Sequence, residues 1–181
     1  MIRKTILATV LALGALLVDG RAGAQDLRGN VYAAPSYGIV GFSEDNAAFL
    51  GWTAGGSVDF GHVNVHFGLQ DYGFWLGKPL TEGYEKQYVQ FVDAMVGYRL
   101  DLWNRLHVTP SVGPYLGIYD VEDATPVLAG VGGSLRIGCD LFWRIGIFAE
   151  GVGRFNAFTS NDVDWKNTYS VSANAGLYFR L

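Results

Sequence analysis

The sequence is short of charge. Asp, Glu, Lys and Arg make up 17% of its 181 residues, whereas a typical water-soluble domain has about 25%. The basic residues form no patch of the kind that binds nucleic acid, which argues against a nucleic-acid partner. The one cysteine, Cys139, excludes a disulfide within the chain. After residue 24, no stretch is as apolar and as long as the ~20 residues that a transmembrane helix needs.

Residues 1–24 have the pattern of a secretory signal peptide. Arg3 and Lys4 give a basic start, an apolar run extends from Ile6 to Val18, and Ala22-Gly23-Ala24 resembles a cleavage site. The apolar run is too short for a membrane anchor. We therefore expect an exported protein whose single mature domain spans 25–181. That domain has 10 basic and 16 acidic residues, a net charge of −6.

What the mature sequence has in place of long apolar runs is alternation. In the segment 88–102, the even-numbered residues are mostly apolar, while Asp93, Arg99 and Asp101 lie at odd positions. A period of two is typical of β-strands with two different faces. An exported chain that is poor in charge and alternates in this way is predicted to be an all-β, antiparallel up-and-down transmembrane β-barrel of eight strands. The eight segments lie near residues 29–40, 51–60, 64–75, 88–102, 106–119, 127–139, 144–156 and 168–181.

A soluble eight-stranded barrel of the lipocalin type is the main rival, because it has the same strand number and alternation. The outer face of such a barrel meets water, so one face of every strand should be rich in Lys, Glu and Thr. Here the polar face carries mostly Gly, Ser, Asn and Tyr. This composition suits a crowded interior and favours the membrane barrel.

The predicted strands are joined alternately by short and longer connections. The short ones lie at 61–62, 103–104 and 142–143, and all three lysines of the mature chain fall in the longer ones. Barrels of the outer membrane have short periplasmic turns and longer extracellular loops. We therefore expect four extracellular loops, which contain "SEDNAA", "KPLTEGYEKQ", "DVEDATP" and "NAFTSNDVDWKN".

The five tryptophans are predicted to form two belts, one at each membrane interface, where tryptophan is enriched. Trp52, Trp75 and Trp165 fall at the loop ends of the predicted strands, and Trp103 and Trp143 fall in the short turns.

The last predicted strand alternates to its end, with Phe179 and Leu181 among its apolar residues. This ending resembles the terminal signal of Gram-negative outer-membrane proteins that the barrel assembly machinery recognises, although Leu181 stands where phenylalanine is usual. With the leader, the eight strands and the loop pattern, the mature chain resembles the small OmpA/OmpX-type barrels of the porin-like superfamily. The resemblance implies a location in the outer membrane and contact with membrane lipid and lipopolysaccharide.

Several charged residues have the parity of the barrel interior. Counting from the turn near Trp143 places Arg136 and Glu150 opposite or diagonal to each other. Eight strands enclose a space that side chains can just fill, so we expect an ionic and hydrogen-bonded lumen network and little room for solutes. Its predicted members are Asp93, Arg99, Arg136, Glu150 and Arg154.

Three prolines fall inside predicted strands, where each removes a hydrogen bond of the ladder. They are Pro35, Pro110 and Pro114. We expect a bulge or a kink at Pro110 and Pro114.

No catalytic, cofactor or metal site is expected. Small outer-membrane lipid A acyltransferases and deacylases work with His, Ser and acidic residues near the outer leaflet, but the three histidines here fall toward the periplasmic end. The acidic loop segments "DVED" and "NDVDW" offer oxygen ligands for Ca²⁺ without the spacing of a dedicated site. The predicted role is structural or surface-interactive, with an unknown extracellular ligand. The alternatives are a narrow conduit for small solutes and, further off, a lipid A modifying enzyme.

Overall fold

The computed structural model describes residues 27–42, 45–76, 88–120, 127–159 and 169–181. They form only β-strands and short turns. The strands are β1 (Leu27–Phe42), β2 (Asp45–Phe60), β3 (Val63–Leu76), β4 (Tyr88–Tyr98), β5 (Leu100–Asp101), β6 (Leu106–Asp120), β7 (Val127–Phe142), β8 (Ile145–Thr159) and β9 (Tyr169–Arg180). None of the described residues belongs to a helix that is long and apolar enough to cross a membrane.

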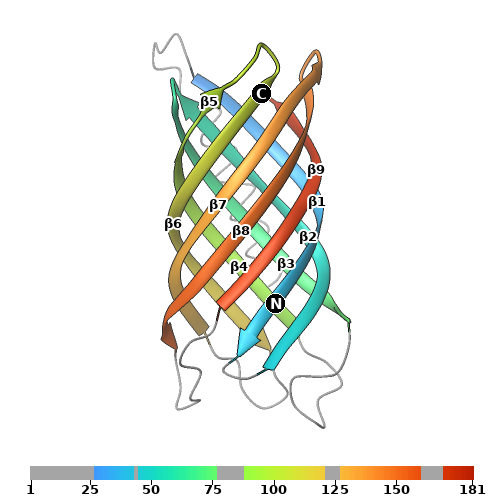
Figure 1. The fold of residues 1–181 in the computed structure, drawn as a ribbon, viewed down its shortest axis with the longest axis vertical. Coiled ribbons are helices and arrows are strands. Elements are labelled where there is room, and N and C mark those ends of the chain that lie inside the picture. Colours follow the sequence, from blue (N-terminus) through green and yellow to red (C-terminus); the bar gives the residue numbers. More distant parts are fainter. Residues whose placement is uncertain (1–26, 43–44, 77–87, 121–126, 160–168) are drawn as a thin grey trace.

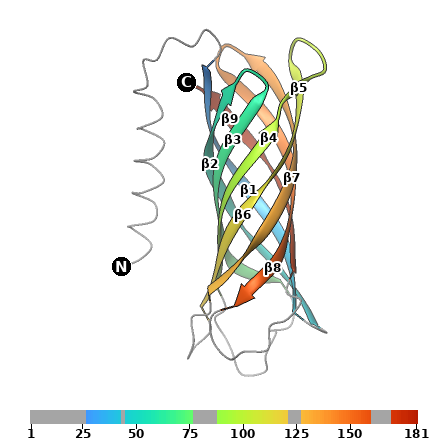
Figure 2. The ribbon, with the colours of Figure 1, turned by 90° about the vertical axis from the view of Figure 1, so that its left-hand side faces the viewer.

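The strands close into a barrel in which neighbours in sequence are neighbours in space (Figures 1 and 2). The two-residue strand β5 continues β4 after a break at Arg99, and both pair with β6, so the wall has eight spanning strands. The last strand pairs with the first, with Asn30 opposite Arg180. Closure gives each of the eight spanning strands two neighbours. The predicted all-β fold of eight antiparallel strands is confirmed, whereas the signal peptide and the boundary at residue 25 lie outside the described residues.

Burial follows the predicted alternation. In β9, Ser172 and Asn174 are buried in the interior, whereas Val171 and Leu177 are exposed on the outer wall. The same pattern around the ring gives an apolar outside and an interior that holds the buried polar and charged side chains together with a cluster of aromatic and aliphatic ones. Among the side chains that the structure describes, the exposed charged ones all lie at the end of the barrel that carries the short turns: Arg28, Asp101, Arg105 and Arg144.

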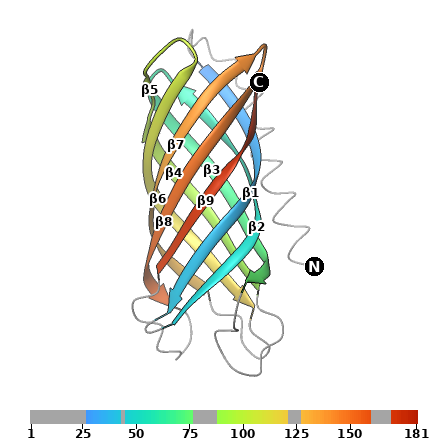
Figure 3. The ribbon, with the colours of Figure 1, turned by 45° about the vertical axis from the view of Figure 1, so that its right-hand side comes forward.

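The short turns lie at one end of the barrel, which is the upper end in Figures 1 and 3, together with the C-terminus. They connect β2 to β3, β5 to β6 and β7 to β8. At the opposite end, the connection between β1 and β2 differs from the prediction. Pairing continues to Phe42 and Asp45, so only residues 43–44 separate the strands. The expected loop "SEDNAA" is therefore wrong, because most of it belongs to β2.

The longer β2 also changes the position of Trp52. The sequence placed this residue at the loop end of its strand, but it lies in the middle of β2, between Pro35 of β1 and Asp71 of β3. That prediction was wrong because the strand starts six residues before the predicted range of 51–60. A membrane crossing needs only about 9 to 11 tilted residues. A crossing of this length that starts at Phe60, at the turn end of β2, ends near Trp52. Trp52 is exposed on the outer wall.

The prolines do not produce the expected bulges. Pairing of β6 with β7 runs without a shift from Leu106 to Ile118, through both Pro110 and Pro114. On its other side, β6 keeps one register with β4, but the pairs around Pro114 are missing between Asp93 and Val96. A backbone N–H points to only one neighbouring strand, so a proline weakens the ladder on one side and leaves the other intact.

The register shifts that do occur lie elsewhere. In β2 a shift falls between Leu50 and Trp52, opposite β3. In β7 shifts lie between Ala129 and Gly130 and between Asp140 and Phe142, opposite β8. Of the two outcomes expected at Pro110 and Pro114, the bulge is therefore wrong, and the kink stays a prediction.

Gly113, next to Pro114, stands where β4 and β6 approach closely. A Cβ atom there would overlap the carbonyl oxygen of Ala94 and lie 2.7 Å from Cα of Met95. We expect Gly113→Ala to lower the free energy of unfolding by about 1 to 3 kcal/mol, because backbone atoms must move apart. Urea unfolding of the protein in vesicles, followed by its heat-dependent gel shift, measures the change.

Gly153→Ala is the matched control for this substitution. A Cβ atom at Gly153 meets nothing within 4 Å, so the expected change is within about 0.5 kcal/mol. Equal unfolding midpoints for the two variants would show that β4 and β6 are not held together at Gly113.

Candidate functional site

The described part of the barrel interior holds one large apolar cluster and several clusters of charged and polar side chains. The half nearer the loop end holds an apolar cluster, which we call the aromatic layer: Val40, Phe49, Tyr72, Val89, Phe91, Tyr115, Tyr119 and Leu128. Phe91 lies at its centre and makes edge-to-face contacts with Tyr72, Tyr115 and Tyr119, with ring centroids 5.9 to 6.1 Å apart. Aromatic rings prefer this geometry. The layer places a set of buried, mutually packed rings inside the barrel.

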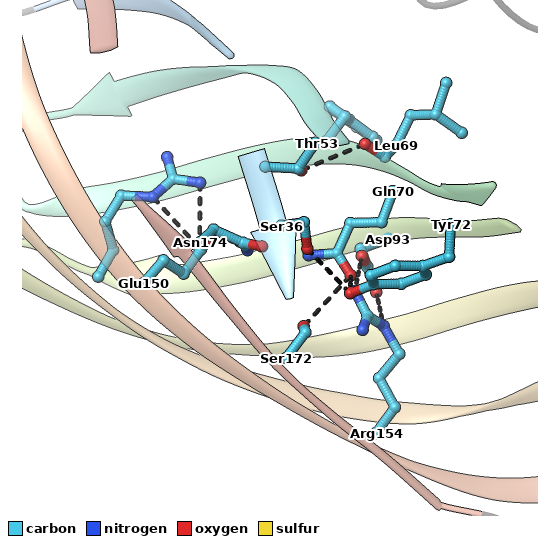
Figure 4. A network of polar contacts seen from close by, with 12 residues as sticks. Ser36, Thr53, Leu69, Gln70, Tyr72, Asp93, Glu150, Arg154, Ser172 and Asn174 are labelled. Atoms are coloured by element: carbon cyan, nitrogen blue, oxygen red, sulfur yellow. Dashed lines mark hydrogen bonds and ion pairs between the residues drawn. The ribbon is translucent and has the colours of Figure 1, made fainter. Parts of the chain in front are cut away.

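An ion pair between Arg154 of β8 and Asp93 of β4 lies against this layer (Figure 4). Arg154 donates from Nε to Oδ1 of Asp93 at 2.7 Å and from a terminal nitrogen to Oδ2, so the pair is bidentate. The guanidinium carbon of Arg154 also lies 4.6 Å from the ring centre of Phe91. Two charges buried this deeply require each other, because either one alone would lack solvation.

A chain of uncharged polar groups extends from Tyr72 (Figure 4). The Tyr72 hydroxyl is 2.9 Å from the Ser36 hydroxyl and donates to Oε1 of Gln70 at 3.2 Å. Ser172 of β9 donates to the same Gln70 oxygen at 3.3 Å. These contacts join strands β1, β3 and β9 through the interior. The sequence analysis did not predict these four residues as members of the network, although inward parity could have indicated them.

A second ion pair joins neighbouring strands nearer the turn end. Arg136 of β7 lies directly opposite Glu150 of β8, and it donates from Nε to Oε1 at 3.2 Å. Asn174 of β9 donates to the other carboxylate oxygen at 3.3 Å. The guanidinium group of Arg136 lies over two rings, 4.1 Å from the centre of Tyr32 and 5.0 Å from that of Phe148.

A third cluster surrounds Arg99 at the break between β4 and β5. Arg99 contacts Asp59 and Asp101, each at 2.9 Å, and Asn64 donates to Asp59 at 2.5 Å. Asp59 was missed by the sequence analysis because it stands just before the Gly61 turn. Its parity with the buried Ser57 is the signal that could have found it.

At the mouth of the barrel near the turns, Asp140 pairs with Arg180 and accepts a hydrogen bond from the Tyr178 hydroxyl. His66 and His107 are buried below this mouth. Among these polar side chains a cavity of about 20 Å³ remains. A single water molecule needs about 10 to 15 Å³ by this kind of measure, so this cavity has room for one or two.

The five charged residues predicted to share a lumen network therefore divide among three clusters. Arg154 pairs with Asp93, and Arg136 pairs with Glu150. Arg99 pairs with two aspartates that were not on the predicted list. No hydrogen bond joins one cluster to another among the described side chains.

The remaining predicted site residues are the other tryptophans and the two residues at the end of the chain. Trp103 and Trp143 are exposed in the short turns, Trp75 belongs to β3, and Trp165 lies outside the described residues. Phe179 lies in β9, and its ring meets that of Trp143 edge to face at 6.3 Å. The backbone of Leu181 donates to the carbonyl of Gly29 at 2.9 Å. Whether Phe179 and Leu181 form an assembly signal stays a prediction.

No protein-family model and no curated protein matches the sequence. Solved structures do resemble it. Neisserial surface protein A superposes with a TM-score of 0.71 at 13% identity and covers 83% of this chain and 96% of its own. Ail, the attachment invasion locus protein of Yersinia pestis, in complex with the heparin analogue sucrose octasulfate, gives 0.63 at 7% identity, with 87% and 100% covered. OprG from Pseudomonas aeruginosa gives 0.61 at 9% identity, with 88% and 98% covered.

The chain has the fold of the small eight-stranded outer-membrane barrels. At these identities the likeness establishes the fold and no more. What the interior can do follows from its contents: paired charges, an aromatic layer and a cavity the size of a water molecule or two.

Proposed function

We propose that this protein is a non-enzymatic outer-membrane barrel with a closed lumen, whose role is structural or surface-interactive. Its partners would be membrane lipid, lipopolysaccharide and, during biogenesis, the barrel assembly machinery. The aromatic layer and the buried ion pairs inside the barrel carry the proposal, because a barrel blocked along its axis leaves its outer wall and its loops as the surfaces that can act. The solved structures that resemble it include a surface protein and an attachment protein.

The outer wall supports the membrane location. Between the two ends of the barrel, the described side chains expose large apolar residues such as Val131, Leu135 and Val171 and no charged ones. A water-soluble barrel would expose an apolar surface of this size only at a cost, whereas a lipid bilayer solvates it. The strand lengths of 14 to 16 residues for β1, β2, β3, β7 and β8 exceed what a crossing requires.

The enzyme alternative finds little support in the positions of the histidines. His62 lies in the β2–β3 turn and stacks on Tyr98, with ring centres 5.4 Å apart. His66 and His107 lie buried in the half of the barrel near the turns. A lipid A modifying enzyme would need its base near the outer leaflet, at the opposite end.

Conductance in planar bilayers separates the closed barrel from the conduit alternative. We expect the purified protein to show no steady channel, because the aromatic layer and the Arg154–Asp93 pair block the axis. Liposome swelling with small sugars and amino acids should likewise be no faster than in empty vesicles. A stable open pore would overturn the closed lumen and favour the conduit.

A further inference from the structure

Two of the short turns share a sequence pattern. Residues 101–106 read Asp-Leu-Trp-Asn-Arg-Leu and residues 140–145 read Asp-Leu-Phe-Trp-Arg-Ile. Both contain an aspartate, a leucine, a tryptophan and an arginine before the next strand begins. Because β6 pairs with β7, the two turns are neighbours. Arg105 of the first donates to the carbonyl oxygen of Leu141 in the second at 3.2 Å.

The arginines of these turns are exposed, and each has a neighbour within the turns: Arg105 donates to Leu141, and the guanidinium carbon of Arg144 lies 5.8 Å from the ring centre of Trp143. The aspartate of each turn is occupied elsewhere, since Asp101 pairs with Arg99 and Asp140 pairs with Arg180. Among the described residues, no carboxylate lies within ion-pair distance of Arg105 or of Arg144. Arg28 is exposed at the same end of the barrel. This end therefore carries an excess of positive charge in a protein whose mature chain is acidic.

The aromatic residues of the turns are also turned outward. Trp103 is 73% exposed and Trp143 is 81% exposed. Leu102 and Phe142 are exposed beside them. Trp143 gains little burial from the barrel itself. The combination of bare aromatic rings with arginine is typical of a membrane interface, where the ring lies at the level of the headgroups.

The backbone gives an independent reason to look outside the chain for the role of Trp143. Its φ is 50°, and among the described residues no other non-glycine residue has a positive φ. In the β2–β3 turn the residue with positive φ is a glycine, Gly61, with φ 62°. This conformation disfavours a bulky side chain and suits glycine. The backbone disfavours tryptophan at this position, and its contacts with Phe179 and Arg144 still leave Trp143 81% exposed, so a surface that the barrel meets can stabilise it more than the barrel does.

We infer that Trp103, Arg105, Trp143 and Arg144, the Trp–Arg patch, bind the phosphate headgroups of anionic phospholipids at the periplasmic face of the membrane. The arginines fit a phosphate diester by charge and by their paired donors. The exposed rings and leucines enter the headgroup region beside this phosphate. A soluble anionic partner would not require such apolar side chains next to the arginines. The inference rests on the proposed membrane location and adds a lipid preference and the residues that produce it.

Lipid selectivity measured by electron paramagnetic resonance tests the inference. The purified protein is inserted into phosphatidylcholine vesicles with a trace of spin-labelled phosphatidylglycerol or spin-labelled phosphatidylcholine, and the immobilised fraction of each label gives their relative association constant. One basic residue near an anionic surface favours it by about fivefold. The measured association constant averages over all the lipids around the barrel, and only those at the patch are affected. We therefore expect about a twofold preference for phosphatidylglycerol, and 0.5 M salt should largely abolish it.

Arg105→Gln/Arg144→Gln should bring this ratio close to one. The control, Lys86→Gln/Lys166→Gln, removes the same charge from segments of the chain that precede β4 and β9, and it should leave the preference unchanged. Each sample is first checked for the heat-dependent gel shift of a folded barrel. A protein that fails to insert contradicts the membrane location itself. A folded wild type without the preference, or a preference that survives the double arginine variant, overturns the Trp–Arg patch alone.

Discussion

Asp93→Ala is expected to lower the free energy of unfolding by about 3 to 5 kcal/mol, because it leaves the guanidinium group of Arg154 buried without a counter-charge. The side chain of Arg154 is fully buried and that of Asp93 is 5% exposed. Water therefore cannot replace the missing carboxylate without disturbing the aromatic layer. Urea unfolding in vesicles, followed by tryptophan fluorescence, measures the loss.

Two variants make this prediction specific to the buried pair. Asp101→Ala removes an ion pair with Arg99 in which the Asp101 side chain is 46% exposed, so the expected loss is about 1 kcal/mol or less. Asp93→Leu/Arg154→Met removes both charges at once and should recover most of the stability that Asp93→Ala loses. Equal losses for Asp93→Ala and Asp101→Ala would mean that the lumen is hydrated at Arg154.

Phe91→Ala is expected to cost about 3 to 5 kcal/mol as well, for a different reason. Phe91 is 1% exposed, and its ring contacts three tyrosines and the guanidinium group of Arg154. Truncation leaves a cavity that these large and mutually packed neighbours cannot fill. The same urea titration in vesicles gives the change in unfolding free energy.

Phe142→Ala is the control for Phe91→Ala, because it removes the same atoms from a phenylalanine on the outside of the barrel. Phe142 is 66% exposed at the β7–β8 turn, so its loss should cost about 1 kcal/mol or less. If Phe142→Ala were the more damaging of the two, the stability of the barrel would come from its contact with the interface and not from its interior.

The strands could be predicted because alternation is a direct consequence of a wall with two different faces. In β9 the serines and the asparagine are buried in the lumen, whereas Val171 and Leu177, at positions of the opposite parity, are exposed on the outer wall. The start of β2 could not be predicted in this way. Asn46, Ala47 and Ala48 show no alternation, yet they are paired with β1 because backbone hydrogen bonds extend a ladder regardless of side chains.

In the interior, only contacts between residues close to the same turn could be predicted, by counting residues from that turn. Arg136 and Glu150 were placed together because both are a few residues from one tight turn, and a turn sets the register of its hairpin. Arg154 and Asp93 are separated by 61 residues and meet across the lumen. Their contact depends on the tilt of β4 and β8 and on the width of the barrel, which no short stretch of sequence encodes.

The pairing of β1 with β9 has a consequence for the order of the strands along the chain. Because Asn30 lies opposite Arg180, a short linker could join the two strand ends, and new termini could be opened between β6 and β7. Such a circular permutant would keep every neighbour of every strand, and surface connections commonly tolerate this change. It would also move Phe179 and Leu181 away from the C-terminus without altering the wall. Permutation therefore separates the closing of the ring by β9 from the predicted role of Phe179 and Leu181 as a terminal assembly signal.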